Sequence, residues 1–197
     1  MTAIGNIEEH PLQPFLPQGA KVLFLGSFPP PREKWSMEFF YPNYINDFWR
    51  VWGVLYFHDK THFERRKAFD REAIEAFATT KGMAFFDTAQ KVCRLRGNAS
   101  DAFLQIIEPT DVESLLKQLP DCHTLATTGG KASEELRNII SNANNGALEV
   151  PAVGGSCELS VWGRQLLWYR MPSTSRAFPM SLEKKAEYYR TLMPRLR

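Results

Sequence analysis

Two asparagines, Asn43 and Asn46, lie in a stretch of the chain that is rich in aromatic side chains. The aromatic residues around them are Trp35, Phe39, Phe40, Tyr41, Tyr44, Phe48, Trp49 and Trp52. Aromatic rings stack on the faces of a flat heterocycle, and an amide can hydrogen-bond to its edge. The stretch therefore suits a pocket for such a ligand, and a loop folded over an aromatic core is the structural alternative.

The loop before this stretch follows an apolar run, residues 22–25, that is long enough for one buried strand. Three prolines at 29–31 end the strand, because proline has no N–H to donate to a sheet. In an open parallel sheet, ligands bind at the carboxyl ends of the strands. We therefore expect the residues of this loop to border the pocket: Gly26, Ser27, Phe28 and Pro29.

Two further predicted strands also end in polar residues. The strand at 83–86 delivers Asp87 and Thr88, and the strand at 123–128 ends in Thr128 before a Gly-Gly turn that opens a helix. Because the N–H groups at a helix N-terminus attract anions, this turn is a natural contact for an anion or for the edge of a ligand.

Small hydroxyl side chains follow a hairpin predicted at 158–169, in the sequence Met171-Pro172-Ser173-Thr174-Ser175-Arg176. Hydroxyl groups, backbone N–H groups and one cation can together hold a phosphate. The alternative is a simple turn capped by its serines.

The net charge is only +2, but its distribution is uneven. Residues 164–197 contain eight Lys or Arg against two acids, and Lys91, Arg94 and Arg96 form a second cluster in a predicted basic loop at 91–98. Such clusters beside a pocket favour a phosphate backbone as partner, although solvated helix faces give similar patterns.

Predicted strands and helices alternate along the chain, which indicates an α/β fold. We expect one domain over residues 1–197, a three-layer α/β/α sandwich with a mostly parallel, four-stranded central sheet. The helices are predicted at 46–56, 70–80, 100–107, 110–119, 130–141 and 181–193. A capping box of Thr110 and Glu113 is expected to start the fourth of them.

Several classes of protein are disfavoured. The three cysteines are widely spaced, which argues against disulfides and an iron–sulfur cluster. His58 and His62 have the spacing of two metal ligands on one face of a helix, but no third ligand is evident, so we expect no metal ion there. We also expect no cofactor. No apolar run reaches the roughly 18 residues of a membrane span, and the N-terminus lacks a signal core. We expect a cytoplasmic monomer that does not contact membranes.

Four motifs, in order, resemble the uracil-DNA glycosylase superfamily, and most of all its branch of hypoxanthine-DNA and mismatch-specific uracil-DNA glycosylases. They are LFLGSFP (23–29) with Asn-x-Phe-Trp at 46–49, GMAFFDTAQKVCRLRGNASDA (82–102), TTGGKA (127–132) and MPSTS (171–175). The resemblance runs from about residue 21 to residue 176.

This resemblance implies the same sandwich fold and a role in base excision repair, in which a damaged base is flipped out of DNA and removed by hydrolysis. Asn46 and Ser27 take the catalytic positions, and the base would contact Gly26, Phe28, Pro29, Asn43, Phe48 and Thr128. DNA would contact Pro172, Ser173, Thr174, Ser175 and Arg176, together with Lys91, Arg94 and Arg96. The implied activity is a monofunctional DNA glycosylase for hypoxanthine or uracil, whose partner is DNA containing a damaged base.

The chain departs from the uracil-removing members at two chemical positions. Ser27 stands where they carry a water-activating Asp or Asn, and Met171 stands where they carry a histidine. Two alternatives therefore stay open: a catalytically silent nucleic-acid-binding protein and a nucleoside or nucleotide hydrolase. The spacing leaves Asn43 as a rival to Asn46, and Arg176 or Phe178 as the side chain that fills the gap left by a flipped base.

Overall fold

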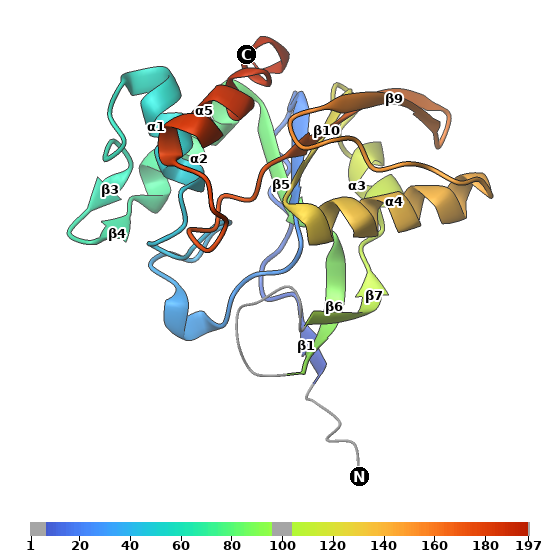
Figure 1. Ribbon diagram of the computed structural model, residues 1–197, viewed down its shortest axis with the longest axis horizontal. Coiled ribbons are helices and arrows are strands. Elements are labelled where there is room, and N and C mark those ends of the chain that lie inside the picture. The colour runs from blue at the N-terminus through green and yellow to red at the C-terminus, as the bar shows by residue number, and fades with distance from the viewer. Residues whose placement is uncertain (1–6, 96–103, 197) are drawn as a thin grey trace.

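A computed structural model describes residues 7–95 and 104–196 (Figure 1). Its centre is a five-stranded sheet in the order β5-β2-β8-β10-β9. These strands are β2 (Val22–Gly26), β5 (Met83–Asp87), β8 (Thr124–Thr128), β9 (Ser156–Val161) and β10 (Arg164–Met171). Four of them are parallel and only β9 is antiparallel, paired with β10 as the predicted hairpin. The expected α/β class, with its mostly parallel sheet, is confirmed. The sheet has five strands where four were predicted, because β9 pairs with β10 and adds an antiparallel edge strand.

Helices cover both faces of this sheet (Figure 1). On one face lie α1 (Phe48–Phe57), α2 (Arg71–Lys81) and α5 (Leu182–Arg190), and on the other lie α3 (Val112–Lys117) and α4 (Gly130–Asn144). Because both faces are covered, strands of this sheet have continuous apolar sequences. Every residue is buried in the inner strand β2 and in the edge strand β5.

Side-chain caps set the ends of several helices. Asp70 accepts from the Ala73 N–H at 3.2 Å to start α2, and Gly82 ends it with a positive φ of 70°. The predicted capping box of Thr110 is wrong, since Asp111 caps α3 by accepting from the Ser114 N–H at 3.0 Å. The Thr110 hydroxyl instead donates to the Asp87 carbonyl at 2.7 Å, in the core below β5.

A second, antiparallel sheet was not predicted. It consists of β1 (Ile7–Glu9), β6 (Ala89–Arg94) and β7 (Leu104–Pro109), in the order β1-β6-β7. The predicted basic loop at 91–98 and helix at 100–107 are therefore wrong where the structure describes them, and residues 96–103 lie outside the described part. The small sheet forms because Val92 and Leu104 pack with Phe28 in a separate apolar cluster.

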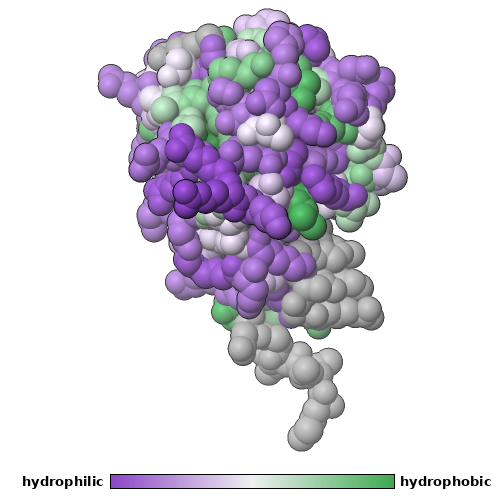
Figure 2. Space-filling model, turned by 90° about the vertical axis from the view of Figure 1, so that its left-hand side faces the viewer, coloured by the Kyte–Doolittle hydropathy of each residue, from purple (hydrophilic) through white to green (hydrophobic). Residues whose placement is uncertain are grey.

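The remaining regular elements are short: the hairpin β3 (Glu64–Arg65) and β4 (Ala68–Phe69), and the 3-10 helices η1 (Arg32–Lys34) and η3 (Met193–Arg195). The face that carries α1, α2 and this hairpin is mainly hydrophilic (Figure 2). Within the described ranges, no helix has both the length and the apolar character needed to cross a membrane.

Most of the aromatic side chains around the two asparagines belong to the core. Phe39, Phe40, Phe48, Trp49 and Trp52 are all buried in the main hydrophobic cluster. The alternative of a loop folded over an aromatic core therefore holds for these rings. Asn43 and Asn46, in contrast, are only partly buried.

Candidate functional site

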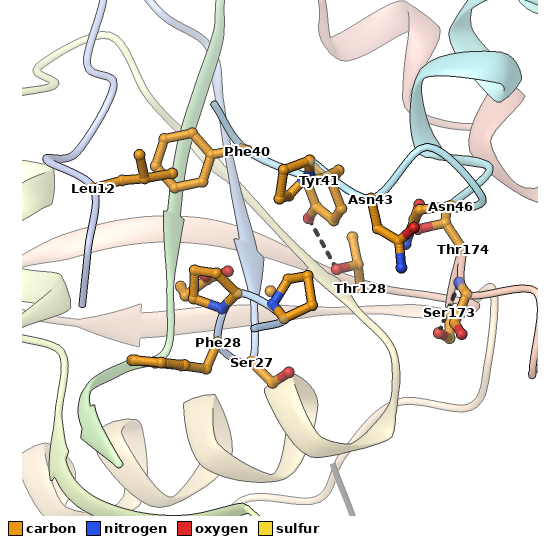
Figure 3. Close-up of a pocket in the computed structure, with 16 residues that line it drawn as sticks. Leu12, Ser27, Phe28, Phe40, Tyr41, Asn43, Asn46, Thr128, Ser173 and Thr174 are labelled. Atoms are coloured by element: carbon orange, nitrogen blue, oxygen red, sulfur yellow. Dashed lines mark hydrogen bonds between the residues drawn. The ribbon is translucent and has the colours of Figure 1, made fainter. Parts of the chain in front are cut away.

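A pocket opens at the carboxyl ends of β2, β5 and β8 and beside the loop after β10 (Figure 3). Its cavity of about 150 Å³ is similar to an engineered cavity that admits one benzene molecule. The lining residues are Leu12, Gly26, Ser27, Phe28, Pro29, Pro30, Phe40, Tyr41, Pro42, Asn43, Asn46, Asp87, Thr128, Ser173, Thr174 and Ser175. Ten of the residues proposed from the sequence thus meet in one cavity.

The two asparagines present their amide groups in a fixed orientation. The Oδ1 atom of Asn46 accepts from the Phe48 N–H at 2.9 Å, and Oδ1 of Asn43 accepts from the Ile45 N–H at 3.1 Å. Only the oxygen of an amide can accept, so neither side chain can flip without losing a bond. The NH2 groups are therefore the ends that can meet a ligand. For Asn46, holding the turn before α1 through the Phe48 N–H and contacting a ligand through its NH2 group are compatible roles.

Tyr41 occupies the place in the pocket that the sequence assigned to Phe48. Its ring stacks on Phe48 with centroids 3.7 Å apart and an interplanar angle of 6°, so Phe48 is fully buried behind it. Its hydroxyl lies 2.9 Å from Oγ1 of Thr128. Burial and the nearby Asp87 carboxylate raise the pKa of Tyr41 above its ordinary value, which keeps the phenol neutral.

Asp87 is a pocket residue that the set of proposed site residues lacked. It is only 7% exposed, and its Oδ2 lies 3.0 Å from Nε2 of His10, a buried side chain from the segment before β2. A Cβ at Gly26 would lie 2.4 Å from Oδ1 of Asp87, so only glycine allows the carboxylate to sit against the end of β2. The sequence feature that could have indicated Asp87 is an acidic residue at the end of a predicted buried strand. Nothing local in the sequence pointed to His10.

The loop after β10 forms the opposite wall and is suited to an anion. The Ser173 and Ser175 oxygens accept from the backbone N–H groups of Ser175 and Ala177, each at 3.2 Å, so their own hydrogens can donate outward. Helix α4 starts beside this loop, where a Cβ on Gly129 would lie 3.4 Å from the Ser173 Cβ. Hydroxyl donors next to a helix N-terminus are a favourable environment for a phosphate.

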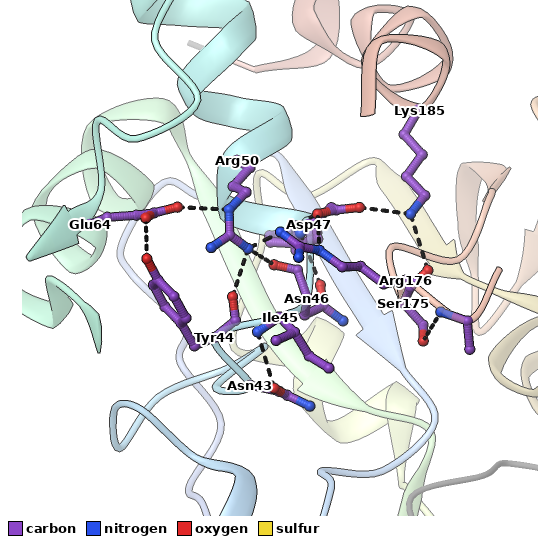
Figure 4. Close-up of polar contacts among 12 residues, drawn as sticks. Asn43, Tyr44, Ile45, Asn46, Asp47, Arg50, Glu64, Ser175, Arg176 and Lys185 are labelled. Carbon is purple, nitrogen blue, oxygen red and sulfur yellow. Dashed lines mark hydrogen bonds and ion pairs between the residues drawn. The ribbon is translucent and has the colours of Figure 1, made fainter. Parts of the chain in front are cut away.

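A buried charge network joins the two walls (Figure 4). Lys185, with a fully buried side chain, donates to Oδ2 of Asp47 at 2.9 Å and to the Ser175 carbonyl at 3.0 Å. The Asp47 N–H donates to the Thr174 carbonyl at 2.9 Å. These contacts hold the asparagine turn and the serine loop in one fixed relation.

Arg50, on α1, supports the asparagine turn from its core side (Figure 4). Its guanidinium donates to the carbonyls of Tyr44 at 2.6 Å and Asn46 at 2.9 Å, and it pairs with the Glu64 carboxylate at 2.6 Å. The Tyr44 hydroxyl also donates to Glu64. The buried Arg50 thus holds the backbone carbonyls of Tyr44 and Asn46 in place.

No family model and no curated protein sequence matches this chain. Among solved structures, it resembles an NMR structure described as a "putative Uracil DNA glycosylase" from Methanosarcina acetivorans. The TM-score is 0.64 at 18% sequence identity, over 96% of this chain and 99% of the other. The chain therefore shares the fold of that protein. The four sequence motifs contain the carboxyl ends of β2, β5, β8 and β10, and residues from each motif line the pocket.

Several residues proposed from the sequence lie away from the pocket. Pro172 is buried behind the serine loop, and Met171 is fully buried in the core. Arg176 lies at the rim, 53% exposed, with its Nε atom 3.3 Å from Oδ1 of Asp47. The loop thus supplies its serines to the pocket and its arginine to the surface beside it.

The predicted basic clusters are largely engaged in internal contacts. On β6, Lys91 pairs with Glu108 at 2.9 Å and Arg94 pairs with Glu8 at 3.0 Å, while Arg96 lies outside the described residues. Arg164 donates to backbone carbonyls at the end of α3. Charge counts along the sequence therefore overstate the cationic surface next to the pocket.

The two histidines with metal-ligand spacing do not form a site. His58 ends α1 with a φ of 54°, and the His62 ring stacks on Phe57 at 3.5 Å. In residues 7–95 and 104–196, no group of three or more His, Cys, Asp or Glu is arranged to hold a metal ion.

Proposed function

We propose that this protein is a monofunctional DNA glycosylase that flips a deaminated base, hypoxanthine or uracil, into the pocket and releases it by hydrolysis. The observation that carries the proposal is the fixed orientation of Asn43 and Asn46, both of which offer NH2 donors to the cavity. The likeness of the fold to a protein described as a uracil DNA glycosylase supports it.

Fixed amide donors favour deaminated bases for a simple chemical reason. Deamination converts the amino donor of adenine or cytosine into a carbonyl acceptor, which gives hypoxanthine or uracil. An asparagine NH2 can bond to that carbonyl, but it opposes an amino group donor to donor. Because the asparagine oxygens are held by Phe48 and Ile45 N–H groups, the amides cannot turn to accept from the undamaged base.

Hydrolysis breaks the bond between the base and C1′ of deoxyribose, and the electron pair leaves with the base. Negative charge grows on its carbonyl oxygen, so a hydrogen bond from Asn46 strengthens in the transition state. Water adds to C1′ and gives up a proton. We assign that proton to Asp87, the carboxylate among the lining residues, whose Oδ2 is held by His10. Its negative charge also favours the positive charge that develops on the sugar.

The reaction is tested with oligonucleotides that carry one uracil or one hypoxanthine, single-stranded and in duplexes. Alkali after incubation converts each abasic site into a strand break, and strands with cytosine or adenine at that position are expected to stay intact. Free deoxyuridine and deoxyinosine form a second arm, in which release of base would favour a nucleoside hydrolase. DNA binding without release from any substrate would favour a catalytically silent protein, and either result would reject the proposal.

The serine loop is expected to contact the DNA backbone. Ser173→Ala and Arg176→Ala should each weaken binding by about 1 kcal/mol, or roughly fivefold, similarly for all sequences, because phosphate contacts carry no sequence information. Filter binding or fluorescence anisotropy across a salt series measures this, and the salt slope should fall by about 1 for Arg176→Ala.

Arg71→Ala on α2 is a matched control for Arg176. Arg71 is 52% exposed and pairs with Glu75, whereas Arg176 is 53% exposed and pairs with Asp47. Equal affinity of wild type, Ser173→Ala and Arg176→Ala at low salt would exclude the loop from the DNA interface.

A further inference from the structure

Ile45 is a large apolar side chain exposed at the rim of the pocket. It lies between Asn43 and Asn46, both of which line the cavity, and it is 55% exposed. Single exposed apolar residues are common on protein surfaces, so the informative feature is the position of Ile45 between two residues of the pocket, not its exposure alone. The neighbouring backbone explains how Ile45 is kept in this position.

The turn that carries Ile45 is rigid (Figure 4). The Asn46 N–H donates to the Asn43 carbonyl at 2.8 Å, which closes a four-residue turn with Tyr44 and Ile45 at its tip. The Ile45 N–H is held by Asn43, and Arg50 holds the carbonyls on both sides of Ile45. An isoleucine side chain is itself stiff, because branching at Cβ restricts its first torsion. The tip is therefore a preformed apolar projection.

Removing a base from a duplex stack leaves a gap between its neighbours. Proteins that distort DNA commonly insert Phe, Leu, Ile, Met or Pro between base steps at such places. We propose that Ile45 is the wedge that enters the base stack as the damaged base enters the pocket. This inference rests on the proposed function. The turn supports it, because the asparagines at its two ends, Asn43 and Asn46, are the residues that would hold the flipped base.

The side chains expected from the sequence to fill the gap are less suited to it. The Nε atom of Arg176 lies 3.3 Å from Oδ1 of Asp47, so inserting Arg176 into the stack would break this ion pair. Phe178 is half-buried, and its N–H is bonded to the Ser175 carbonyl at 3.1 Å. The structure thus favours the asparagine turn over the serine loop as the source of the wedge.

A wedge is required only where a stack must be opened. Ile45→Ala should lower the single-turnover excision rate from duplexes by about 10-fold, and it should change the rate from single strands by less than about twofold. Ile45→Leu should restore most of the duplex rate. A bulky aromatic group such as pyrene opposite the lesion should also restore it, because that group occupies the space of the base pair and displaces the damaged base. Ile107→Ala, at a 46% exposed isoleucine on β7 outside the pocket lining, is the control and should behave as wild type.

The outcomes are separable. A normal duplex rate for Ile45→Ala, or an equal loss on single strands, would overturn the wedge while leaving the glycosylase proposal intact. If wild type releases no base from either form of DNA, the proposed function fails instead. The wedge is then tested by binding alone, with a fluorescent 2-aminopurine beside a mismatch. An increase in fluorescence with wild type that Ile45→Ala lacks would support unstacking by Ile45, and equal signals would overturn it.

Discussion

Replacing Asn46 by aspartate is expected to lower the excision rate by about 100-fold or more without lowering the melting temperature. Aspartate can accept from the Phe48 N–H as asparagine does at 2.9 Å, so the start of α1 is preserved. Its second oxygen cannot donate when ionised, and it would face the departing base with a negative charge. Single-turnover rates with enzyme in excess, together with thermal unfolding, measure the two effects separately.

Asn43→Asp is the matched control, because Asn43 has the same arrangement of a bonded oxygen and a free-facing NH2 group. A large rate loss in Asn43→Asp alone would move the principal role to Asn43. Retention of the wild-type rate in both variants would contradict the assignment of amide donors to the base. Substitution by alanine is less informative, since it would remove the acceptor for the Phe48 N–H together with the donor.

The sequence predicted those parts of the fold that are determined locally. Continuous apolar runs correctly indicated the buried strands β2, β5 and β8, since a sheet covered on both faces needs them. The Gly129-Gly130 turn correctly marked the start of α4. Because parallel strands end at the same edge of a sheet, Ser27 and Thr128, which follow two different strands, were predicted to line one pocket, and they do.

The errors arise where distant contacts decide the structure. The segment of β6 is polar and basic, and it is a strand only because β1 and β7 pair with it from elsewhere in the chain. The ring of Tyr41 lies between Phe48 and the pocket, and the spacing of aromatic residues along the sequence does not reveal this arrangement. His10 reaches Asp87 across 77 positions of sequence. The roles of individual aromatic and charged residues therefore required the structure.

Lys185 shows how a surface-type residue can be essential to the site. Lysine side chains are usually exposed, but Lys185 lies one turn before Tyr189 on the buried face of α5, and its ammonium is bonded to Asp47 and to the Ser175 carbonyl. A buried charge is tolerated only when it is paired and hydrogen-bonded. Because these partners belong to the two walls of the pocket, the pair fixes the distance between the asparagine turn and the serine loop.

Lys185→Met is therefore expected to lower the free energy of unfolding by about 3 kcal/mol and to reduce base excision as well. Methionine fills similar space, but it leaves the Asp47 carboxylate, which is 9% exposed, with only Arg176 at 3.3 Å and Arg50 at 4.0 Å. Urea unfolding measures the loss. The neighbouring Lys184→Met is the control: Lys184 is 56% exposed and pairs with Glu187 at 2.6 Å, and exposed pairs contribute at most about 1 kcal/mol.

The double variant Asp47→Asn with Lys185→Met separates the cost of an unpaired charge from the loss of packing. Removing both charges should restore much of the stability lost in Lys185→Met, because no buried carboxylate is left without its cation. Excision should stay low in the double variant, since the bond from Lys185 to the Ser175 carbonyl is still missing. A Lys185→Met variant no less stable than Lys184→Met would contradict this account of the buried pair. Full excision activity in the double variant would show that the two walls keep their positions without it.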